Sequence, residues 1–165
     1  MLVLGVDPGT ASTGYGLVRQ SPSGNSLEMV DYGVIRTSPN FSDDQRLLAL
    51  YQQLKSILLL HCPDGGAVEK LFFQRNTRTA MAVSQARGVI LLALAETGVP
   101  VAEYTPNEVK QAVAGYGGAD KTQVQQMVRV LLELGGLPQP DDAADALAVA
   151  ICHLHSQRYQ ALTGL

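Results

Sequence analysis

Apolar runs near the start of the chain have the pattern of β-strands. Residues 1–6 form a continuous apolar run that ends in Asp7-Pro8-Gly9, which is typical of a buried strand closing in a turn. Two further segments, 14–20 and 27–38, flank a Ser-Pro-Ser-Gly-Asn turn. We therefore expect three strands joined as antiparallel hairpins.

Farther along the chain the apolar spacing becomes that of helices. Between residues 42 and 62, apolar residues recur at helical spacing behind an acidic first turn, which predicts a long amphipathic helix. Further helices are predicted at 76–97, at 106–135 with a break near 115–118, and at 141–155, and short strands from 65 and from 99. Hairpin strands followed by strand–helix–strand crossovers favour an α/β fold, with a mixed five-stranded sheet flanked by helices.

Length and composition fit one globular domain over residues 1–165. The chain is 46% hydrophobic and 16% charged. Its longest strongly apolar run, Gly88–Ala95, is less than half of the roughly 20 residues that a bilayer span requires, so no membrane span is expected. The N-terminus lacks the pattern of a signal peptide, and the two cysteines have no zinc or disulfide spacing. These features predict a protein of the reducing cytoplasm.

The charge balance by itself speaks against a nucleic-acid ligand. The chain has 12 basic and 15 acidic residues, a net charge of −3. The segment from Lys70 to Ala95 nevertheless carries four basic residues and no carboxylate: Lys70, Arg75, Arg78 and Arg87. This local excess is consistent either with a phosphate-binding surface or with an ordinary solvated helix face.

Four acidic residues stand out by their positions. Asp7 ends a buried strand, and Glu69 lies in an otherwise apolar one, where an unpaired carboxylate is costly. Asp142 and Asp145 are neighbours on the last predicted helix, where like charges are unfavourable unless they share a cation. A turn residue at Asp7 and a dipole partner at Asp142 are the structural alternatives.

Together these carboxylates predict a metal-dependent hydrolase. Oxygen-only ligands suit Mg²⁺ or Mn²⁺ rather than zinc. Two such ions, about 3.5–4 Å apart, can activate water and stabilise the departing oxygen of a phosphodiester. Two divalent cations would also turn the net charge from −3 to +1, which removes the objection to a phosphate-rich ligand.

Five segments in order resemble the RuvC family of bacterial Holliday junction resolvases. They are VDPGTASTGYG from Val6, AVEKLFFQRNTRTA from Ala67, SQARGV from Ser84, EVKQAVAGYGGADKTQVQ from Glu108 and DAADALAVAICHLH from Asp142. The resemblance implies a ribonuclease-H-like fold and a homodimer that makes paired symmetric nicks in four-way DNA junctions, in homologous recombination and DNA repair, leaving 5′-phosphate and 3′-hydroxyl ends. It also implies partnership with the RuvA–RuvB branch-migration complex.

The same resemblance gives individual residues their roles. Asp7, Glu69, Asp142 and Asp145 match the four acidic residues that hold two divalent ions in the family. Asp141 is an alternative metal ligand, but the DAAD spacing favours Asp142 and leaves Asp141 as a plausible N-cap. Residues expected to contact DNA are the basic Lys110, Lys121, Arg75 and Arg78, and either Phe72 or Phe73 as a base-stacking aromatic.

Two other functions compete with the nuclease. Asp7, Gly9, Thr10 and Gly14 also resemble the first phosphate loop of actin-type and sugar-kinase phosphotransferases, although 165 residues leave no room for the second domain of such enzymes. A non-catalytic DNA-binding module is the third possibility. Such a module has little reason to keep four carboxylates facing phosphates.

Overall fold

The computed structural model of this chain describes residues 1–70 and 77–164, and it contains the five predicted strands. The strands are β1 (Leu2–Asp7), β2 (Ser12–Gln20), β3 (Leu27–Arg36), β4 (Gly65–Glu69) and β5 (Val101–Tyr104). The helices are α1 (Asp43–His61), α2 (Thr77–Glu96), α3 (Pro106–Ala114), α4 (Lys121–Leu131) and α5 (Asp141–Thr163).

The strands form one mixed sheet, as predicted. Its order is β3-β2-β1-β4-β5. The pairs β1–β2 and β2–β3 are antiparallel, whereas β1–β4 and β4–β5 are parallel. The hairpins therefore build one half of the sheet and the crossovers build the other, and the two halves meet at β1.

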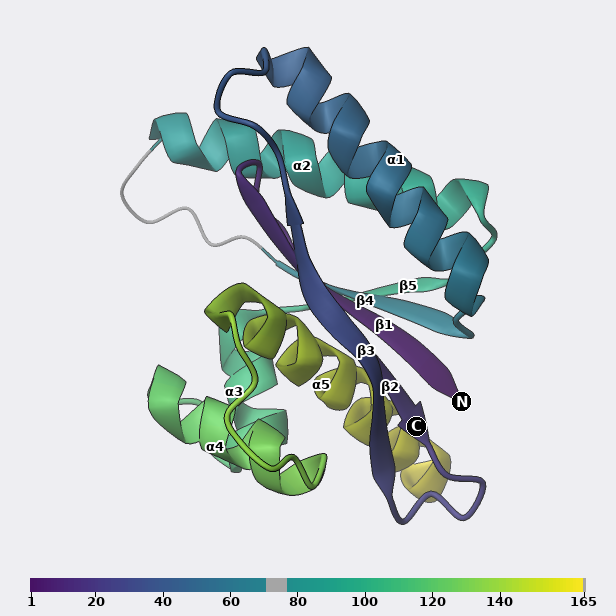
Figure 1. Cartoon of the computed structure of the whole chain (residues 1–165). Helices are drawn as coiled ribbons and strands as arrows, with labels where there is room; N and C mark the ends of the chain where they lie inside the picture. Colours follow the sequence, from purple (N-terminus) through teal and green to yellow (C-terminus); the bar gives the residue numbers. More distant parts are fainter. Residues whose placement is uncertain (71–76, 165) are drawn as a thin grey trace.

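Helices cover both faces of the sheet (Figure 1). On one face, α1 and α2 enclose a core that includes Leu4, Val6 and Leu54. On the other, α3, α4 and α5 enclose a second core that includes Val3, Ala67 and Leu147. Val3 and Leu4 enter different cores because successive strand residues point to opposite faces.

The predicted break near 115–118 is confirmed, whereas the ends of the C-terminal helices differ from their predictions. Gly115 ends α3 with a φ of 87°, and Asp120 begins α4 with a capping box, so the segment 106–135 forms two separate helices, the second of which ends at Leu131. The helix expected at 141–155 continues to Thr163. His153 therefore lies well inside α5, and its Nδ1 is 2.9 Å from the Tyr104 hydroxyl.

Helix α5 lies directly on the sheet because the strands beneath it carry glycines. A Cβ at Gly5 would collide with the Ala146 carbonyl, and one at Gly14 would collide with the Asp142 carbonyl. A Cβ at Gly16 would come within 2.8 Å of Leu147. The missing side chains thus let the N-terminal half of α5 approach β1 and β2 closely.

Helix α2 has one face toward the core and one toward solvent. Ala86, Ile90 and Leu94 pack into the core shared with α1. The stretch Thr79–Glu96 has a mean hydropathy of 1.2, so it is long and apolar enough to cross a membrane, although core helices satisfy the same two criteria. Met81 and Leu92, 64% and 61% exposed, lie on the solvent side.

Candidate active site

Asp7 and Glu69 are brought together by the register of two parallel strands. Val6 of β1 pairs with Val68 of β4, so Asp7 and Glu69 follow side by side at the strand ends. Ala67 packs in the core below α5, and the two-residue period places Glu69 on the same face. In β1, Val3 packs in the same core, so Asp7, four residues farther along the strand, also faces α5. Both carboxylates therefore lie beneath the start of α5.

Asp142 and Asp145 approach from the first turns of α5. Both are partly buried, whereas the neighbouring Ala143 and Ala144 are fully buried against the sheet. The hydroxyl of Ser12, at the start of β2, donates to Oδ2 of Asp142. Because Gly14 has no side chain, the backbone of Asp142 can lie directly against β2, which fixes the distance between the start of α5 and the sheet.

Burial and the neighbouring charges raise the pKa values of Asp7, Glu69 and Asp145. Burial, followed by the charges of Glu69, Asp145 and Asp142, raises the pKa of Asp7 from 3.8 to about 8. Burial and then the Asp145 charge raise the pKa of Glu69, opposed by hydrogen bonding from Asp7 and by Lys110 and Lys121. Burial also raises the pKa of Asp145. A bound divalent cation would oppose this rise by offsetting the neighbouring charges.

Two lysines border the carboxylates. A cavity of about 190 Å³ lies between α3, α4 and α5, and its lining includes Glu69, Lys110, Lys121 and Asp145. Lys121 Nζ lies 3.1 Å from Asp145 Oδ2 and 3.2 Å from Asp141 Oδ2. Burial opposes the charge of Lys121, but the hydrogen bonds to Asp145 and Asp141 raise its pKa. Cationic groups thus stand at one side of an acidic site.

The donor set suits hard divalent cations. Among the described residues, the groups that act on Asp7 at this point are the carboxylates and Lys121, and carboxylate oxygens are the ligands that Mg²⁺ and Mn²⁺ prefer. Within residues 1–70 and 77–164, no three His, Cys, Asp or Glu side chains are already arranged to hold one ion. Lys121 instead pairs with Asp145, and burial among the other carboxylates raises the pKa of Asp7. A divalent cation would supply the positive charge that these carboxylates share with Lys121.

Comparisons with known proteins identify the family. The family model described as "Crossover junction endodeoxyribonuclease RuvC" matches residues 3–153. A protein of that name from Pelotomaculum thermopropionicum is 56% identical over 160 residues, covering 97% of this chain and 96% of the relative. One from Desulfitobacterium hafniense is 58% identical over 156 residues, covering 94% and 93%. The chain belongs to the RuvC family.

Solved structures agree with this assignment. The Thermus thermophilus RuvC structure superposes with a TM-score of 0.90 at 38% identity, covering 96% of both chains. T. thermophilus RuvC in complex with Holliday junction substrate superposes with a TM-score of 0.88 at 35% identity, again covering 96% of both chains. The predicted RuvC-type fold, a mixed five-stranded sheet with helices, is thereby confirmed.

Not every residue predicted from the RuvC resemblance can be placed. Phe72, Phe73 and Arg75 lie outside the described residues, as does the side chain of Arg78 in the first turn of α2. Arg87, which contributed to the local basic excess, forms an ion pair with Glu103 on β5 and is thus partly neutralised. Lys110 and Lys121 line the same cavity as Glu69 and Asp145, and their contact with DNA stays a prediction.

The structure also corrects the interpretation of Asp141 and adds two residues. Pro140, not Asp141, is the N-cap of α5. Asp141 accepts instead from Lys121 and from Gln125 Nε2 at 3.1 Å, and these bonds lower its pKa. Ser12 and Gln125 were not predicted, because neither residue has a sequence signal that distinguishes it from ordinary strand and helix residues.

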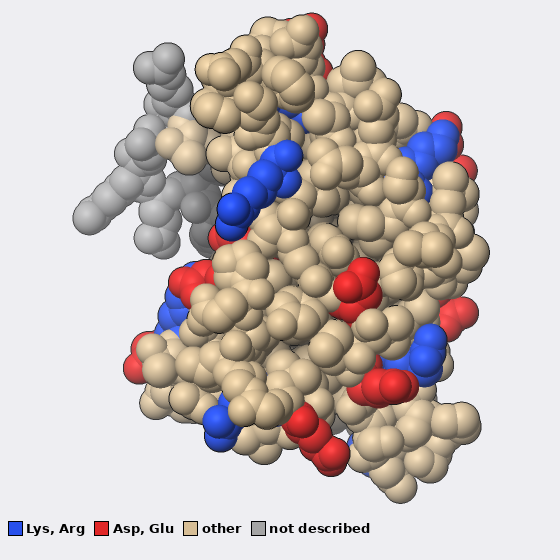
Figure 2. All heavy atoms as spheres, viewed as in Figure 1, with Lys and Arg blue, Asp and Glu red and all other residues tan. Residues whose placement is uncertain are grey.

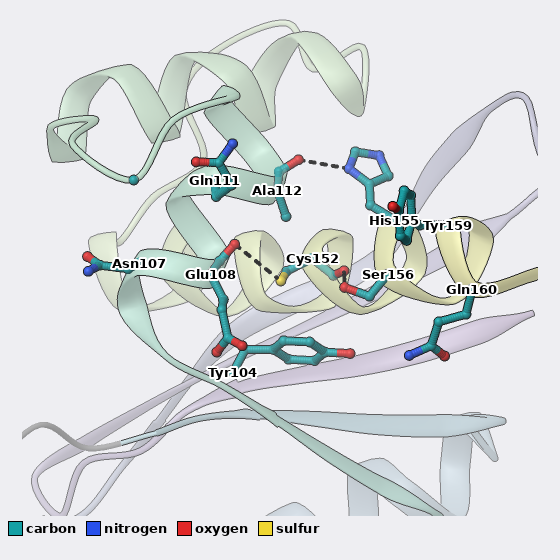
Figure 3. Close-up of a pocket in the computed structure, with 11 residues that line it drawn as sticks. Tyr104, Asn107, Glu108, Gln111, Ala112, Cys152, His155, Ser156, Tyr159 and Gln160 are labelled. Carbon is teal, nitrogen blue, oxygen red and sulfur yellow. Dashed lines mark hydrogen bonds between the residues drawn. The ribbon is translucent and has the colours of Figure 1, made fainter. Parts of the chain in front are cut away.

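A larger hollow in this RuvC-family chain lies elsewhere (Figure 3). It has a volume of about 830 Å³ and lies between α3 and the C-terminal half of α5, with Tyr104 and Cys152 among its lining residues. None of the four acidic residues lines it. His155 Nδ1 lies 2.9 Å from the Ala112 carbonyl at its edge. This larger hollow is therefore separate from the acidic site.

Proposed function

We propose that this chain is a structure-selective endonuclease that resolves four-way DNA junctions, with Asp7, Glu69, Asp142 and Asp145 as its metal-binding residues. The observation that carries the proposal is the convergence of these carboxylates at the ends of β1 and β4 and the start of α5, in a chain of the crossover junction endodeoxyribonuclease family. The alternative phosphotransferase and pure binding roles have no comparable support.

The four carboxylates would hold Mg²⁺ or Mn²⁺, with two ions for each site. Bound divalent cations would supply a water of lowered pKa and a positive charge for the leaving oxygen of a phosphodiester. The protein's own contribution is to keep the carboxylates partly buried and to release the Asp7 proton when positive charge arrives. Hydrolysis would leave ligatable 5′-phosphate and 3′-hydroxyl ends.

DNA would approach over the lysine-bordered side of the site. Lys110 and Lys121 lie at the cavity that Glu69 and Asp145 also line, so a phosphate reaching the carboxylates meets both ammonium groups. Lys121 is also the first residue of α4, where the helix dipole favours anions. Arg75, Arg78 and either Phe72 or Phe73 are proposed on sequence grounds to add backbone and stacking contacts.

Charge on the face shown in Figure 2 does not gather into one basic patch. On the face in Figure 2 most side chains are uncharged, and the acidic and basic groups are interspersed. The net charge is −3. We therefore expect binding to depend chiefly on the cations beside the site and on the bound metal ions.

A homodimer would present two sites to a junction. The solvent-facing stripe of α2, made of Met81, Gln85, Gly88 and Leu92, follows helical spacing. A Cβ at Gly88 would meet nothing within 4 Å, so this glycine does not serve packing against the chain's own sheet. A two-fold contact of α2 with its copy would cover this stripe.

The cellular setting follows from the same family membership. We propose that the protein acts on recombination and repair intermediates in the bacterial cytoplasm. We further propose cooperation with the RuvA–RuvB branch-migration complex. Co-sedimentation of the purified proteins on one junction would test that partnership.

The decisive experiment is cleavage of a synthetic four-way junction, with linear duplex of the same sequence as the substrate control. With Mg²⁺ or Mn²⁺ we expect paired symmetric nicks in the junction, little cutting of the duplex, and none with EDTA. Glu69→Gln should bind the junction but cut it at least about a hundredfold more slowly. Glu28→Gln, on the exposed edge of β3, should cut normally. Normal cutting by Glu69→Gln would disprove the metal assignment, and ATP turnover without nicking would favour the kinase alternative.

A further inference from the structure

Helices α4 and α5 face each other through two matched pairs of polar side chains. Helix α4 presents Lys121 and Gln125 four residues apart, and α5 presents Asp141 and Asp145 at the same spacing. Lys121 Nζ lies 3.2 Å from Asp141 and 3.1 Å from Asp145, and Gln125 Nε2 donates to Asp141 at 3.1 Å. Asp141 is therefore joined to both members of the α4 pair.

Asp141 is held more firmly than an ordinary surface acid. Its partner Gln125 is only 8% exposed, so the amide is fixed by the packing of α4 against α5. One carboxylate oxygen of Asp141 accepts from this amide, and the other faces Lys121. Pro140 already occupies the N-cap, so the Asp141 side chain is not needed there.

We propose that Asp141 is a positioning residue for Lys121. It keeps the ammonium group at the edge of the carboxylate site, where a substrate phosphate would meet it. The proposal rests on the nuclease function. Lys121 is half exposed and has a long flexible stem, so without two partners its ammonium would spread over many rotamers. If Asp145 takes a metal ion, Asp141 is the carboxylate that still holds the lysine.

Single-turnover junction cleavage at saturating enzyme measures the effect on the cutting step. Asp141→Asn keeps the size of the side chain but loses its charge, and it should slow cutting about three- to tenfold. Junction affinity should change less than the cutting rate. Asp141→Glu, which restores the charge, should recover most of the rate. Gln125→Met should slow cutting in the same direction, because it removes the anchor of Asp141.

A double-mutant cycle separates positioning from a general structural effect. If Asp141 acts through Lys121, then adding Asp141→Asn to Lys121→Met should cause no further loss of rate. Asp43→Asn, an acidic residue in the first turn of α1, is the control for helix-dipole effects and should leave cutting unchanged. Additive losses in the cycle would overturn the proposal.

Two further outcomes would also overturn it. If Asp141→Asn shifts the Mg²⁺ concentration needed for half-maximal cutting as strongly as Asp142→Asn does, Asp141 is a metal ligand instead. If wild type cuts and the folded Asp141→Asn and Gln125→Met variants cut at the same rate, Asp141 has no positioning role. Failure of wild type to cut any junction would instead refute the nuclease proposal itself.

Discussion

Asp7 shows how a single carboxyl group can be unfavourable for stability and useful for function. It is buried next to three other carboxylates, which raises its pKa from 3.8 to about 8. Between these pH values the folded state binds a proton that the unfolded chain has released. The contribution of Asp7 to stability therefore falls as pH rises from about 4 to about 8. A bound divalent cation would stabilise the ionised Asp7 and so remove this loss of folding stability.

Replacing Asp7 should consequently stabilise the metal-free protein. In EDTA at pH 8, Asp7→Asn is expected to raise the free energy of unfolding by about 1–3 kcal/mol, because the variant has no carboxyl group to deprotonate there. At pH 4 the difference should be small. Urea unfolding of both proteins at the two pH values measures this, and saturating Mg²⁺ should reverse the order at pH 8. A variant less stable than wild type at pH 8 in EDTA would contradict the placement of Asp7.

At the scale of elements, the site depends on how closely α5 lies on the sheet. Its acidic residues occupy the first two turns, and their height above Asp7 and Glu69 is set by the glycines of β1 and β2. Gly14 lies directly beneath the backbone of Asp142. A side chain at this position would have to move the helix or the strand, and the packed core on the same face resists both.

Gly14→Ala should therefore damage stability and activity together. We expect a loss of about 1–3 kcal/mol in unfolding free energy and a cleavage rate at least about tenfold lower, since Asp142 would be displaced. Gly136→Ala is the matched control, because a Cβ there would meet nothing within 4 Å. Chemical denaturation and junction cleavage measure the two effects. Equal behaviour of both variants would show that α5 tolerates displacement.

At the scale of the whole molecule, the solvent-facing stripe of α2 is the surface on which we expect a second copy of the chain to bind. Leu92 is 61% exposed on a helix whose opposite side is fully packed. Exposed apolar side chains at helical spacing are typical of surfaces that a partner covers. A second copy of this chain would also supply the second nick of a symmetric pair.

Leu92→Glu should accordingly produce a monomer. Two like charges facing each other across a two-fold contact would be desolvated and would repel, which favours dissociation. Analytical ultracentrifugation measures the mass, and a junction with one strand labelled in each pair distinguishes single from paired nicks. Val130→Glu, at an exposed position of α4, should leave the mass unchanged. A Leu92→Glu variant that remains dimeric would place the dimer contact elsewhere.

Much of the fold could be predicted because its signals are local. The turn after Asp7, the helical spacing from Ser42 and the strand of Glu69 each depend on neighbouring residues, and each element is present in the structure. The position of Gly115 indicated a break, but not that two separately capped helices result. The end of α5 was placed too early because the polar residues after His155 still form a regular helix in the structure.

The amino-acid order by itself determined the alternation of strands and helices and marked four acidic residues as out of place for a purely structural role. Those conclusions rest on periodicity and on the cost of burying charge, which need only the identity of nearby residues. Only the tertiary structure decided that Val6 lies opposite Val68, that Ser12 reaches Asp142, and that Asp141 faces Lys121 rather than capping its helix. These contacts join residues far apart in the chain, and strand register and helix packing bring them together.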